Sequence, residues 1–336
     1  MASEFADLYK ARGKHSLENR QSERRTRLLK VQKLQRNELI DDLRGIQEIV
    51  KNLKGPRHAK RPNNNQLQLS EWLIEKPDDW SDWYLVPCPK GTRCLVVAHN
   101  GRTESFNKHG KFLKHFRSDL PGDSTNKRAT TILDCIFISS TKEYHVLDVL
   151  AYRNQDMVNC DAEFRFFWIA SKIIDEQLDV VTVSNEHTFK MIERIDCADE
   201  MAIGERLSTY PIWEKNLPEL DGFLFYHKES SYVHGKTPLV GWLFAFMIPE
   251  VLAVPYMNPA YLNELPVGYV DYSTYIREFD ENAAKQGRSR RRRTNGDKMD
   301  TEAVDDPDSM DAVVAAERCL EMEESYDERE EFDVDV

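Results

Sequence analysis

The sequence predicts an α+β protein with mostly antiparallel sheets, preceded by a long basic helix and followed by a disordered charged tail. Short runs of β-branched and aromatic residues recur through the middle of the chain, and Gly, Pro, Asn, Asp and Lys turn signals separate them. Charge is segregated at the two ends. The 336 residues suffice for one sizeable domain or two small ones. We therefore expect a helical arm over 1–60, a folded domain over 61–272 and a tail over 273–336.

The N-terminal arm is basic. Ten basic and two acidic residues lie within Lys10–Arg36, which gives this stretch a net charge of +8. Ser16 is suitable as a helix N-cap and Gly55-Pro56 as a stop, so we expect one helix of about 38 residues. Its apolar stripe is confined to the second half, at Leu39, Leu43, Ile46, Val50 and Leu53. The first half is too polar to bury itself in its own domain, so it is a solvated helix, a short coiled coil or an interaction arm.

The strands of the folded domain are expected at recurring apolar runs, namely WYLVPC, CLVVAH, TTILDCIFI, YHVLDVLAY, DGFLFYH and PLVGWLF. Two helices are expected, at about 161–175 and near 197–208. This mixture is typical of an α+β domain with mostly antiparallel pairing.

The tail is poor in apolar residues and rich in charge. Seventeen acidic and three basic residues lie between Asp297 and Val336. A segment of this composition cannot bury enough apolar surface to fold alone, so disorder is expected. The cluster RSRRRR at 288–293 is either a second nuclear localisation element or a solvated linker.

Composition excludes several classes of protein. No apolar run approaches the roughly 18–20 residues that a membrane span needs, and the N-terminus lacks the apolar region of a secretory signal. The six cysteines show no CxxC pairing, so we expect reduced thiols in the cytosol or nucleus. No pair of cysteines or histidines has a zinc-ligand spacing, so neither a metal nor a cofactor is expected.

The stretch CPKGTR at 88–93 resembles the K-x-D-G-x-R nucleophile motif of nucleotidyltransferases, such as mRNA capping enzymes and DNA ligases. The runs ILDCIF, YHVLDVLAY and LDGFLFYHKESSY resemble the next strand motifs of that superfamily in order and spacing. PLVGWLF lies where the enzymes carry a Lys-x-Lys pair. The resemblance implies a nucleotidyltransferase-like, more narrowly an mRNA guanylyltransferase-like, fold for the folded domain.

The departures from that motif set bear on function. Cys88 stands in place of the lysine and cannot form the phosphoramidate. Ile136 stands where the metal-binding acid belongs, and Gly241 and Leu243 replace the lysines that neutralise a triphosphate. We therefore predict a site that binds a nucleotide without reacting with it, with no catalytic residue. Two alternatives stay open: a guanylyltransferase-like enzyme that uses Cys88, and a general RNA-binding protein without cap selectivity.

Long runs of the chain are similar to the snurportin family. They are NNQLQLSEWLIEKPDD, CPKGTRCLVV, DAEFRFFWIASK, DGFLFYHK and TPLVGWLF in the folded domain and SLENRQSERRTRLLKVQKLQR in the arm, so the resemblance covers roughly 8–255. It implies a nuclear import adaptor, not an enzyme, that binds the trimethylguanosine cap of uridine-rich small nuclear RNAs. It also implies that the adaptor links the ribonucleoprotein to importin-β and shuttles between nucleus and cytoplasm.

The resemblance implies a cap site built around two tryptophans. Trp242 would stack on the cap base, and Trp72 would border the base and its added methyl groups; a positively charged methylated guanine stacks well on an indole. Arg93 and Lys108 would contact phosphate. The full set implied is Leu69, Ser70, Trp72, Cys88, Arg93, Lys108 and Trp242.

The resemblance also implies that the arm binds the acidic inner surface of importin-β. The implied residues are Arg20, Arg24, Arg25, Arg27, Lys30, Lys33 and Arg36. Thr26 interrupts what is a continuous arginine run in the family, and Asp41-Asp42 follow. In the segment that would meet the export receptor, exportin, only Phe5 and Leu8 offer apolar anchors.

Overall fold

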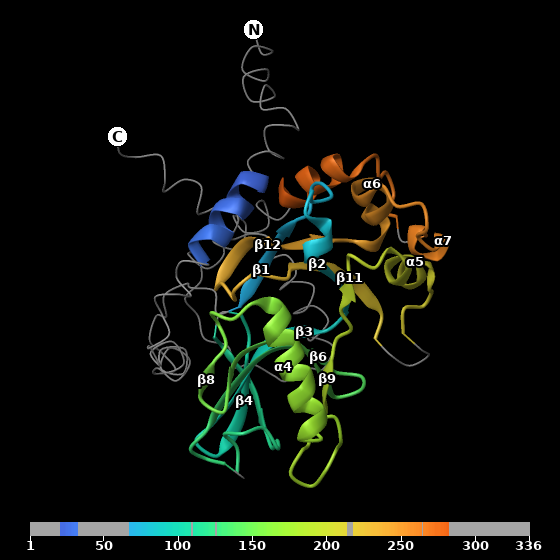
Figure 1. Ribbon diagram of the computed structural model, residues 1–336. Coiled ribbons are helices and arrows are strands. Elements are labelled where there is room, and N and C mark those ends of the chain that lie inside the picture. The colour runs from blue at the N-terminus through green and yellow to red at the C-terminus, as the bar shows by residue number, and fades with distance from the viewer. Residues whose placement is uncertain are drawn as a thin grey trace, which may run out of the picture. The chain divides into compact units, whose positions relative to one another are not determined.

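A computed structural model describes residues 21–32, 67–108, 110–124, 126–213, 218–263 and 265–281. The chain divides into two compact units, 1–263 and 264–336. The first unit carries both sheets of the protein, which Figure 1 shows with their strand labels. In the described part of the chain, no helix is both long enough and apolar enough to cross a membrane.

Sheet A has five strands in the order β1-β12-β11-β2-β10. Their bounds are Gln68–Trp72 for β1, Gly235–Leu243 for β12, Leu220–His227 for β11, Trp83–Pro89 for β2 and Ile195–Asp196 for β10. The β1 strand runs parallel to β12, and the other neighbours are antiparallel.

Sheet B has seven strands, six of them in the order β5-β4-β3-β6-β7-β8, with β9 parallel to β7. Their bounds are Phe112–Phe116 for β5, Arg102–Phe106 for β4, Thr92–His99 for β3, Thr130–Ile138 for β6, Glu143–Tyr152 for β7, Gln155–Asp156 for β8 and Phe189–Met191 for β9. The other pairings in this sheet are antiparallel. The predicted α+β class with mostly antiparallel sheets is therefore confirmed.

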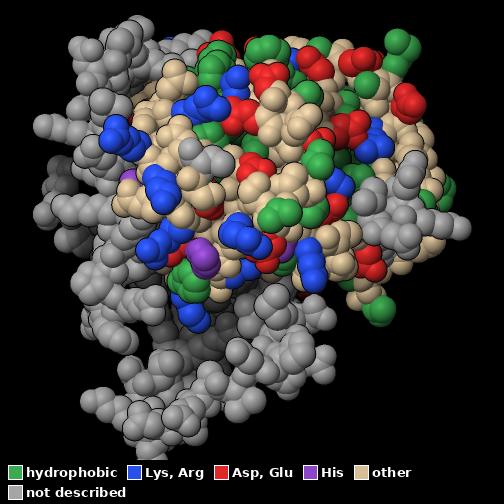
Figure 2. Space-filling view, turned by 90° about the horizontal axis from the view of Figure 1, so that it is seen from below, with side chains coloured by type: hydrophobic (Ala, Val, Ile, Leu, Met, Phe, Trp, Pro, Cys, Tyr) green, Lys and Arg blue, Asp and Glu red, His purple; other side chains and the backbone are tan. Residues whose placement is uncertain are grey.

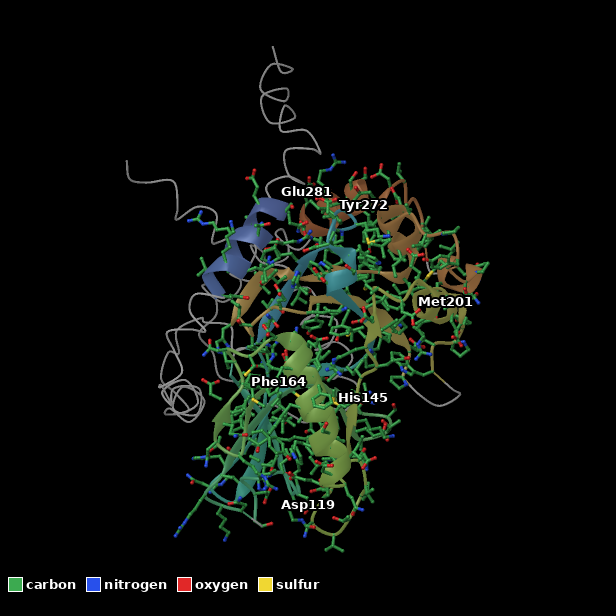
Figure 3. The ribbon with its side chains drawn as sticks, in the orientation of Figure 1. Asp119, His145, Phe164, Met201, Tyr272 and Glu281 are labelled. Carbon is green, nitrogen blue, oxygen red and sulfur yellow. The ribbon has the colours of Figure 1, made fainter. Side chains whose placement is uncertain are left out.

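Both helices expected in the folded domain are present. They are α4 (Ala162–Asp175), which lies along sheet B (green in Figure 1), and α5 (Glu200–Ser208). In α4, Ile169 is buried in the core of sheet B, whereas Phe164 projects outward and is 44% exposed (Figure 3). The shorter helical elements are η1 (Trp80–Asp82), η2 (Ala245–Met247), α6 (Ile248–Leu252) and α7 (Pro259–Leu262).

Two further stretches are helical. Residues 21–32 form a helix in the predicted arm, of which the remainder lies outside the described residues. Residues 272–281 are helical although the sequence predicts disorder from 273 onward. Asp271 explains this start, since its carboxylate accepts a hydrogen bond from the backbone N–H of Thr274 at 2.7 Å, as a helix N-cap does. The rest of the predicted tail, 282–336, lies outside the described residues.

The two sheets share an apolar core. Val86, Leu224 and Val240 of sheet A pack in one buried cluster with Ile136 and Leu147 of sheet B. Apolar side chains on alternate positions of a strand face one side of its sheet, so this cluster defines the inner face of sheet A. The inner face of sheet A is the face that carries the even-numbered side chains of β2 and β12.

Two buried aspartates lie side by side in sheet B. Asp134 on β6 and Asp148 on β7 are register partners, and both are fully buried. Arg93 pairs with Asp134, and Arg165 of α4 pairs with Asp148 through two hydrogen bonds of 2.8 Å. A buried carboxylate is tolerated only when it is paired and hydrogen-bonded, so each aspartate depends on its arginine.

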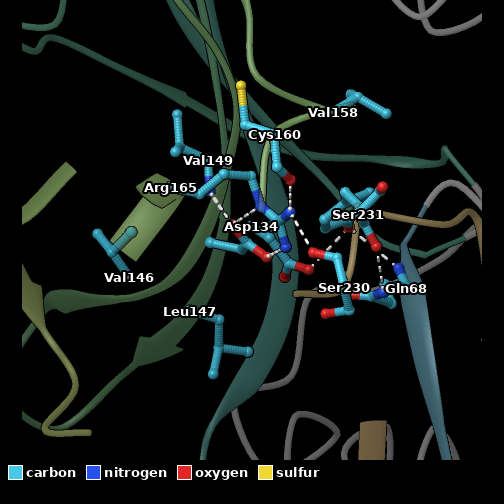
Figure 4. Close-up of polar contacts among 12 residues, drawn as sticks. Gln68, Asp134, Val146, Leu147, Val149, Val158, Cys160, Arg165, Ser230 and Ser231 are labelled. Atoms are coloured by element: carbon cyan, nitrogen blue, oxygen red, sulfur yellow. Dashed lines mark hydrogen bonds and ion pairs between the residues drawn. The ribbon is translucent and has the colours of Figure 1, made fainter. Parts of the chain in front are cut away.

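The Arg165 side chain also joins separate segments of the chain. It donates to the backbone carbonyl oxygens of Cys160 and Ser230 (Figure 4). Ser230 follows β11 of sheet A, whereas Asp148 belongs to sheet B. One guanidinium therefore links the two sheets at a point that water does not reach.

The far end of sheet B presents a different surface. Figure 2 shows this face, where the described Lys and Arg side chains are interspersed with Asp and Glu and only scattered apolar side chains. Mixed charge of this kind is typical of a solvated surface.

We predict that Arg165→Met lowers the free energy of unfolding by about 3–5 kcal/mol, because it leaves the buried Asp148 carboxylate without its hydrogen-bonded cation. Urea unfolding followed by circular dichroism measures the loss. Lys172→Met is the matched control, since Lys172 pairs with Asp175 at the surface of the same helix, and it is expected to change stability by no more than about 0.5 kcal/mol. Equal losses in the two variants would contradict the role given to Arg165.

Candidate functional site

Two predicted tryptophans meet at the edge of sheet A. Trp72 ends β1 and Trp242 lies near the end of β12, and they are register partners in the parallel pair. The backbone N–H of Leu73 donates to the carbonyl oxygen of Trp242 at 3.1 Å, which fixes the two strands at this level. Both indoles are half-buried. Residues 170 positions apart in the chain are therefore placed side by side with part of each ring accessible.

A phenylalanine that the sequence analysis did not single out completes the aromatic group. The ring centroid of Phe244 lies 5.8 Å from that of Trp72 and 6.1 Å from that of Trp242. These separations are within the range of favourable tilted and edge-to-face ring contacts. We call Trp72, Trp242 and Phe244 the aromatic group. The sequence run WLF could have predicted the place of Phe244, because side chains two residues apart in an extended chain, such as Trp242 and Phe244, lie on the same face.

Gly222 supports the indole of Trp242. A Cβ atom at this glycine would lie 2.5 Å from Cζ2 and 2.9 Å from Cη2 of Trp242, and 2.7 Å from the carbonyl oxygen of Leu243. Only a residue without a side chain allows the ring to lie so close to β11. The Asp-Gly motif at 221–222 predicted a glycine on this strand, but it did not predict that the glycine makes room for the Trp242 ring.

Cys88 lies opposite Gly222 in the pairing of β2 with β11. Its side chain is 6% exposed and belongs to the apolar core between the sheets, with Val86 and Ile136. The thiol is thus surrounded by core side chains, in keeping with a small buried residue. Its predicted contact with a cap stays a prediction.

Leu69 and Ser70 lie on β1, before Trp72. Leu69 is buried, whereas Ser70 is half-buried and pairs with Thr237 of β12. A register irregularity follows between Ser70 and Glu71. Such an irregularity re-aims the side chains beyond it, so it helps to set the direction of Trp72.

Arg93 is engaged within the protein. Its Nε and Nη2 donate to the Asp134 carboxylate at 3.2 and 2.9 Å, and Nη2 also donates to the backbone carbonyl oxygen of Gln68 at 2.6 Å. Burial alone lowers the pKa of this guanidinium, but the Asp134 carboxylate raises it well above its ordinary value. The Gln68 contact ties the start of β1 to sheet B, which makes Arg93 a positioning residue for the strand that carries Trp72. The predicted phosphate contact of Arg93 stays a prediction.

Lys108 follows β4 (Arg102–Phe106) of sheet B. It is 3% exposed. The register of the strands brings together Ser70, Trp72, Trp242 and, through Gly222, Cys88. The predicted role of Lys108 in phosphate binding stays a prediction.

The arm residues divide into two kinds. Arg24, Arg27 and Lys30 are exposed, whereas Arg25 is buried against sheet A. The predicted residues Arg20, Lys33 and Arg36 lie outside the described residues.

One cluster has the residue types of a metal site. Ligand atoms of Asp79, Asp82 and His227 lie within 4.8 Å of one another. The two carboxylate oxygens of Asp79 already accept hydrogen bonds, one from the Trp83 indole N–H at 3.0 Å and one from His227 Nε2 at 3.2 Å. The hydrogen bond from His227 lowers the pKa of Asp79 to about 2. These contacts account for the cluster as a hydrogen-bonded element of the fold.

The chain matches a known protein family over the residues that form the two sheets. The family described as "Snurportin1, m3G cap-binding domain" matches residues 66–245, which is more than half of the chain. This range runs from just before β1 to just past β12, so it includes the whole aromatic group.

Among solved structures, the chain is similar to the ligase domain of LigD from M. tuberculosis and to a mycobacterial DNA ligase D complexed with ATP and MES. The sequence identities are 13% and 12%, and the TM-scores are 0.34 and 0.35. Each match covers 53% of this chain, and the chain spans 58% and 59% of the two ligase chains.

We predict that Gly222→Ala displaces the Trp242 ring and costs about 1–3 kcal/mol of stability through overpacking. Near-ultraviolet circular dichroism reports the ring, and urea unfolding reports the stability. The matched control is Gly204→Ala on α5, where the added Cβ would meet Tyr256 at ordinary contact distances of 3.7 Å or more and is expected to be neutral or stabilising. Unchanged indole signals in Gly222→Ala would show that the glycine does not position Trp242.

Proposed function

The chain belongs to the snurportin family and carries its m3G cap-binding domain, and on this premise we propose that it is a nuclear import adaptor. It binds the trimethylguanosine cap of uridine-rich small nuclear RNAs. Its basic arm links the resulting ribonucleoprotein to a receptor of the importin-β family. The observation that carries the proposal is the pairing of Trp72 with Trp242 in adjacent strands at the edge of sheet A.

The chemistry of the aromatic group fits a methylated cap. The base of such a cap carries a positive charge, and an indole face attracts both a stacked base and a cation. An amino group that carries methyls loses hydrogen bonds, so it favours an apolar wall over a polar one. Trp72 and Phe244 offer such a wall beside Trp242, with both indoles partly accessible.

The buried charges favour binding over chemistry. Metal-dependent nucleotidyl transfer needs carboxylates that can hold a metal ion. Asp134 and Asp148, the aspartates of the strand motifs, are each committed to an arginine in a two-pronged pair. Cys88, which replaces the nucleophilic lysine, lies in the apolar core.

Incubation with labelled GTP and a divalent metal, followed by denaturation, should therefore leave no covalent label on the protein.

The arm supplies the receptor contact in this proposal. Arg27 and Lys30 are exposed on the helix of residues 21–32, where they can meet an acidic surface. The proposed cycle takes the adaptor between cytoplasm and nucleus, with an exportin as the return receptor. Phe5 and Leu8 are the anchors proposed for that return contact.

We predict that Trp242→Ala weakens binding of a trimethylguanosine cap dinucleotide by about 1–3 kcal/mol, the stacking contribution of one aromatic side chain. Isothermal titration measures the affinity. Trp168→Ala is the control, because Trp168 is a half-buried tryptophan on α4, outside the aromatic group. Unchanged affinity in Trp242→Ala would remove this residue from the cap site.

We predict that reversing Arg27 and Lys30 to Glu weakens importin-β binding about tenfold or more, because attraction to an acidic surface becomes repulsion. Cap affinity should stay unchanged in the same variant. The matched control reverses Arg102 and Lys127, two exposed basic residues of sheet B and its loops, with the same change in net charge. Loss of cap binding together with receptor binding would argue against separate sites.

A further inference from the structure

The helix of residues 21–32 lies on sheet A, on the face opposite the core between the sheets (blue in Figure 1). Arg24 forms a two-pronged pair with Glu71 of β1, with Nη2 to Oε1 at 2.6 Å and Nη1 to Oε2 at 3.4 Å. Arg25 Nε donates to the backbone carbonyl oxygen of Pro238 on β12 at 3.2 Å. Two consecutive arginines of the helix thus bind two neighbouring strands, Arg24 to β1 and Arg25 to β12.

Both ends of this helix are also held. Gln21 Nε2 donates to the carbonyl oxygen of Trp72 at 3.5 Å, and Gln32 Oε1 accepts from the backbone N–H of Ser231 at 3.1 Å. The buried positions 21, 25 and 32 recur at helical spacing, so they define one face of the helix. We call Glu71, Trp83, Ser231 and Pro238 the arm-docking face of the domain.

Arg25 is a buried cation of the described part of the arm. It is 5% exposed, and its guanidinium carbon lies 5.1 Å from the ring centroid of Trp83, in the range of a cation–π contact. Burial lowers the pKa of Arg25, while the carboxylates of Asp79 and Glu71 oppose that shift. A buried cation held by a carbonyl, a ring and nearby carboxylates marks a built docking site and not a chance surface contact.

The β1 strand serves both faces of sheet A. Successive side chains of a strand point to opposite faces, so Glu71 reaches the helix while Trp72 joins the aromatic group. The docked helix and the proposed cap site therefore lie on opposite faces of sheet A.

We propose that the arm-docking face holds residues 21–32 in the receptor-free protein, and that an acidic receptor of the importin-β type has to displace them. This inference rests on the proposed function of the arm. Arg24 and Arg25 cannot face Glu71 and Pro238 and a receptor surface at the same time. The receptor therefore binds only the undocked fraction, and its apparent affinity falls by that fraction.

The test places the substitution in the arm-docking face of the domain, so that the sequence of the arm, which the receptor binds, stays unchanged. Glu71→Gln removes the charge that holds Arg24. Glu176→Gln is the matched control: Glu176 pairs with Arg153 at 2.9 Å, both glutamates are 19% exposed, and their arginines are 57% and 56% exposed. Hydrogen exchange of the amides in 21–32 and titration with importin-β are measured on the full chain for both variants.

We expect Glu71→Gln to speed exchange across 21–32 and to tighten importin-β binding by roughly two- to fivefold, the range implied by the loss of one partly exposed ion pair. Glu176→Gln should change neither. Unprotected amides in the unmodified chain would overturn docking, and faster exchange with unchanged receptor affinity would overturn the competition. A chain that never binds importin-β would instead refute the proposed function of the arm, because the exchange data report docking independently.

Discussion

Asp134 and Asp148 lie next to each other in the middle of sheet B, and two like charges in that position can persist only if each has its own cation. Arg93 and Arg165 provide the cations, and each also binds backbone carbonyls of a different segment. Arg93 reaches Gln68 at the start of β1, and the β1 strand ends in Trp72. The charge balance of sheet B thereby contributes, together with the pairing of β1 and β12, to the position of the strand that carries Trp72.

The same two aspartates connect fold and function. In a metal-dependent nucleotidyl-transferring enzyme, carboxylates hold the metal ion that contacts the phosphates. Here Arg93 and Arg165 pair with Asp134 and Asp148, and the described part of the edge of sheet A presents a group of partly accessible rings. The arrangement suits recognition of a flat, positively charged base. The β1 strand takes part in two contacts, because its successive side chains point to opposite faces of sheet A. Glu71 contacts the basic helix, and Trp72 belongs to the aromatic group.

The sequence predicted the fold class, both helices of the folded domain and the strands that carry Cys88 and Trp242, because local periodicity and turn residues determine these features. It could not predict that Arg93 faces Asp134 or that Trp72 pairs with Trp242, because strand register between distant segments leaves no local trace. Nor could charge patterning reveal that Arg25 is buried. A run of basic residues predicts that its side chains are exposed to solvent. Arg25 can be buried because the Pro238 carbonyl oxygen accepts its hydrogen bond and the Trp83 ring lies beside its guanidinium.

We propose that Trp72 and Trp242 form a site for a trimethylated cap. The most direct measurement is a tryptophan fluorescence titration of the full chain with trimethylguanosine cap dinucleotide, monomethylated cap and GTP in parallel. We predict strong, saturable quenching by the trimethylated cap and much weaker responses to the other two. The monomethylated cap shares the positive charge but lacks the methyl groups on the amino nitrogen that favour an apolar aromatic wall, and GTP lacks both. Equal responses to all three ligands, or none to any, would contradict it.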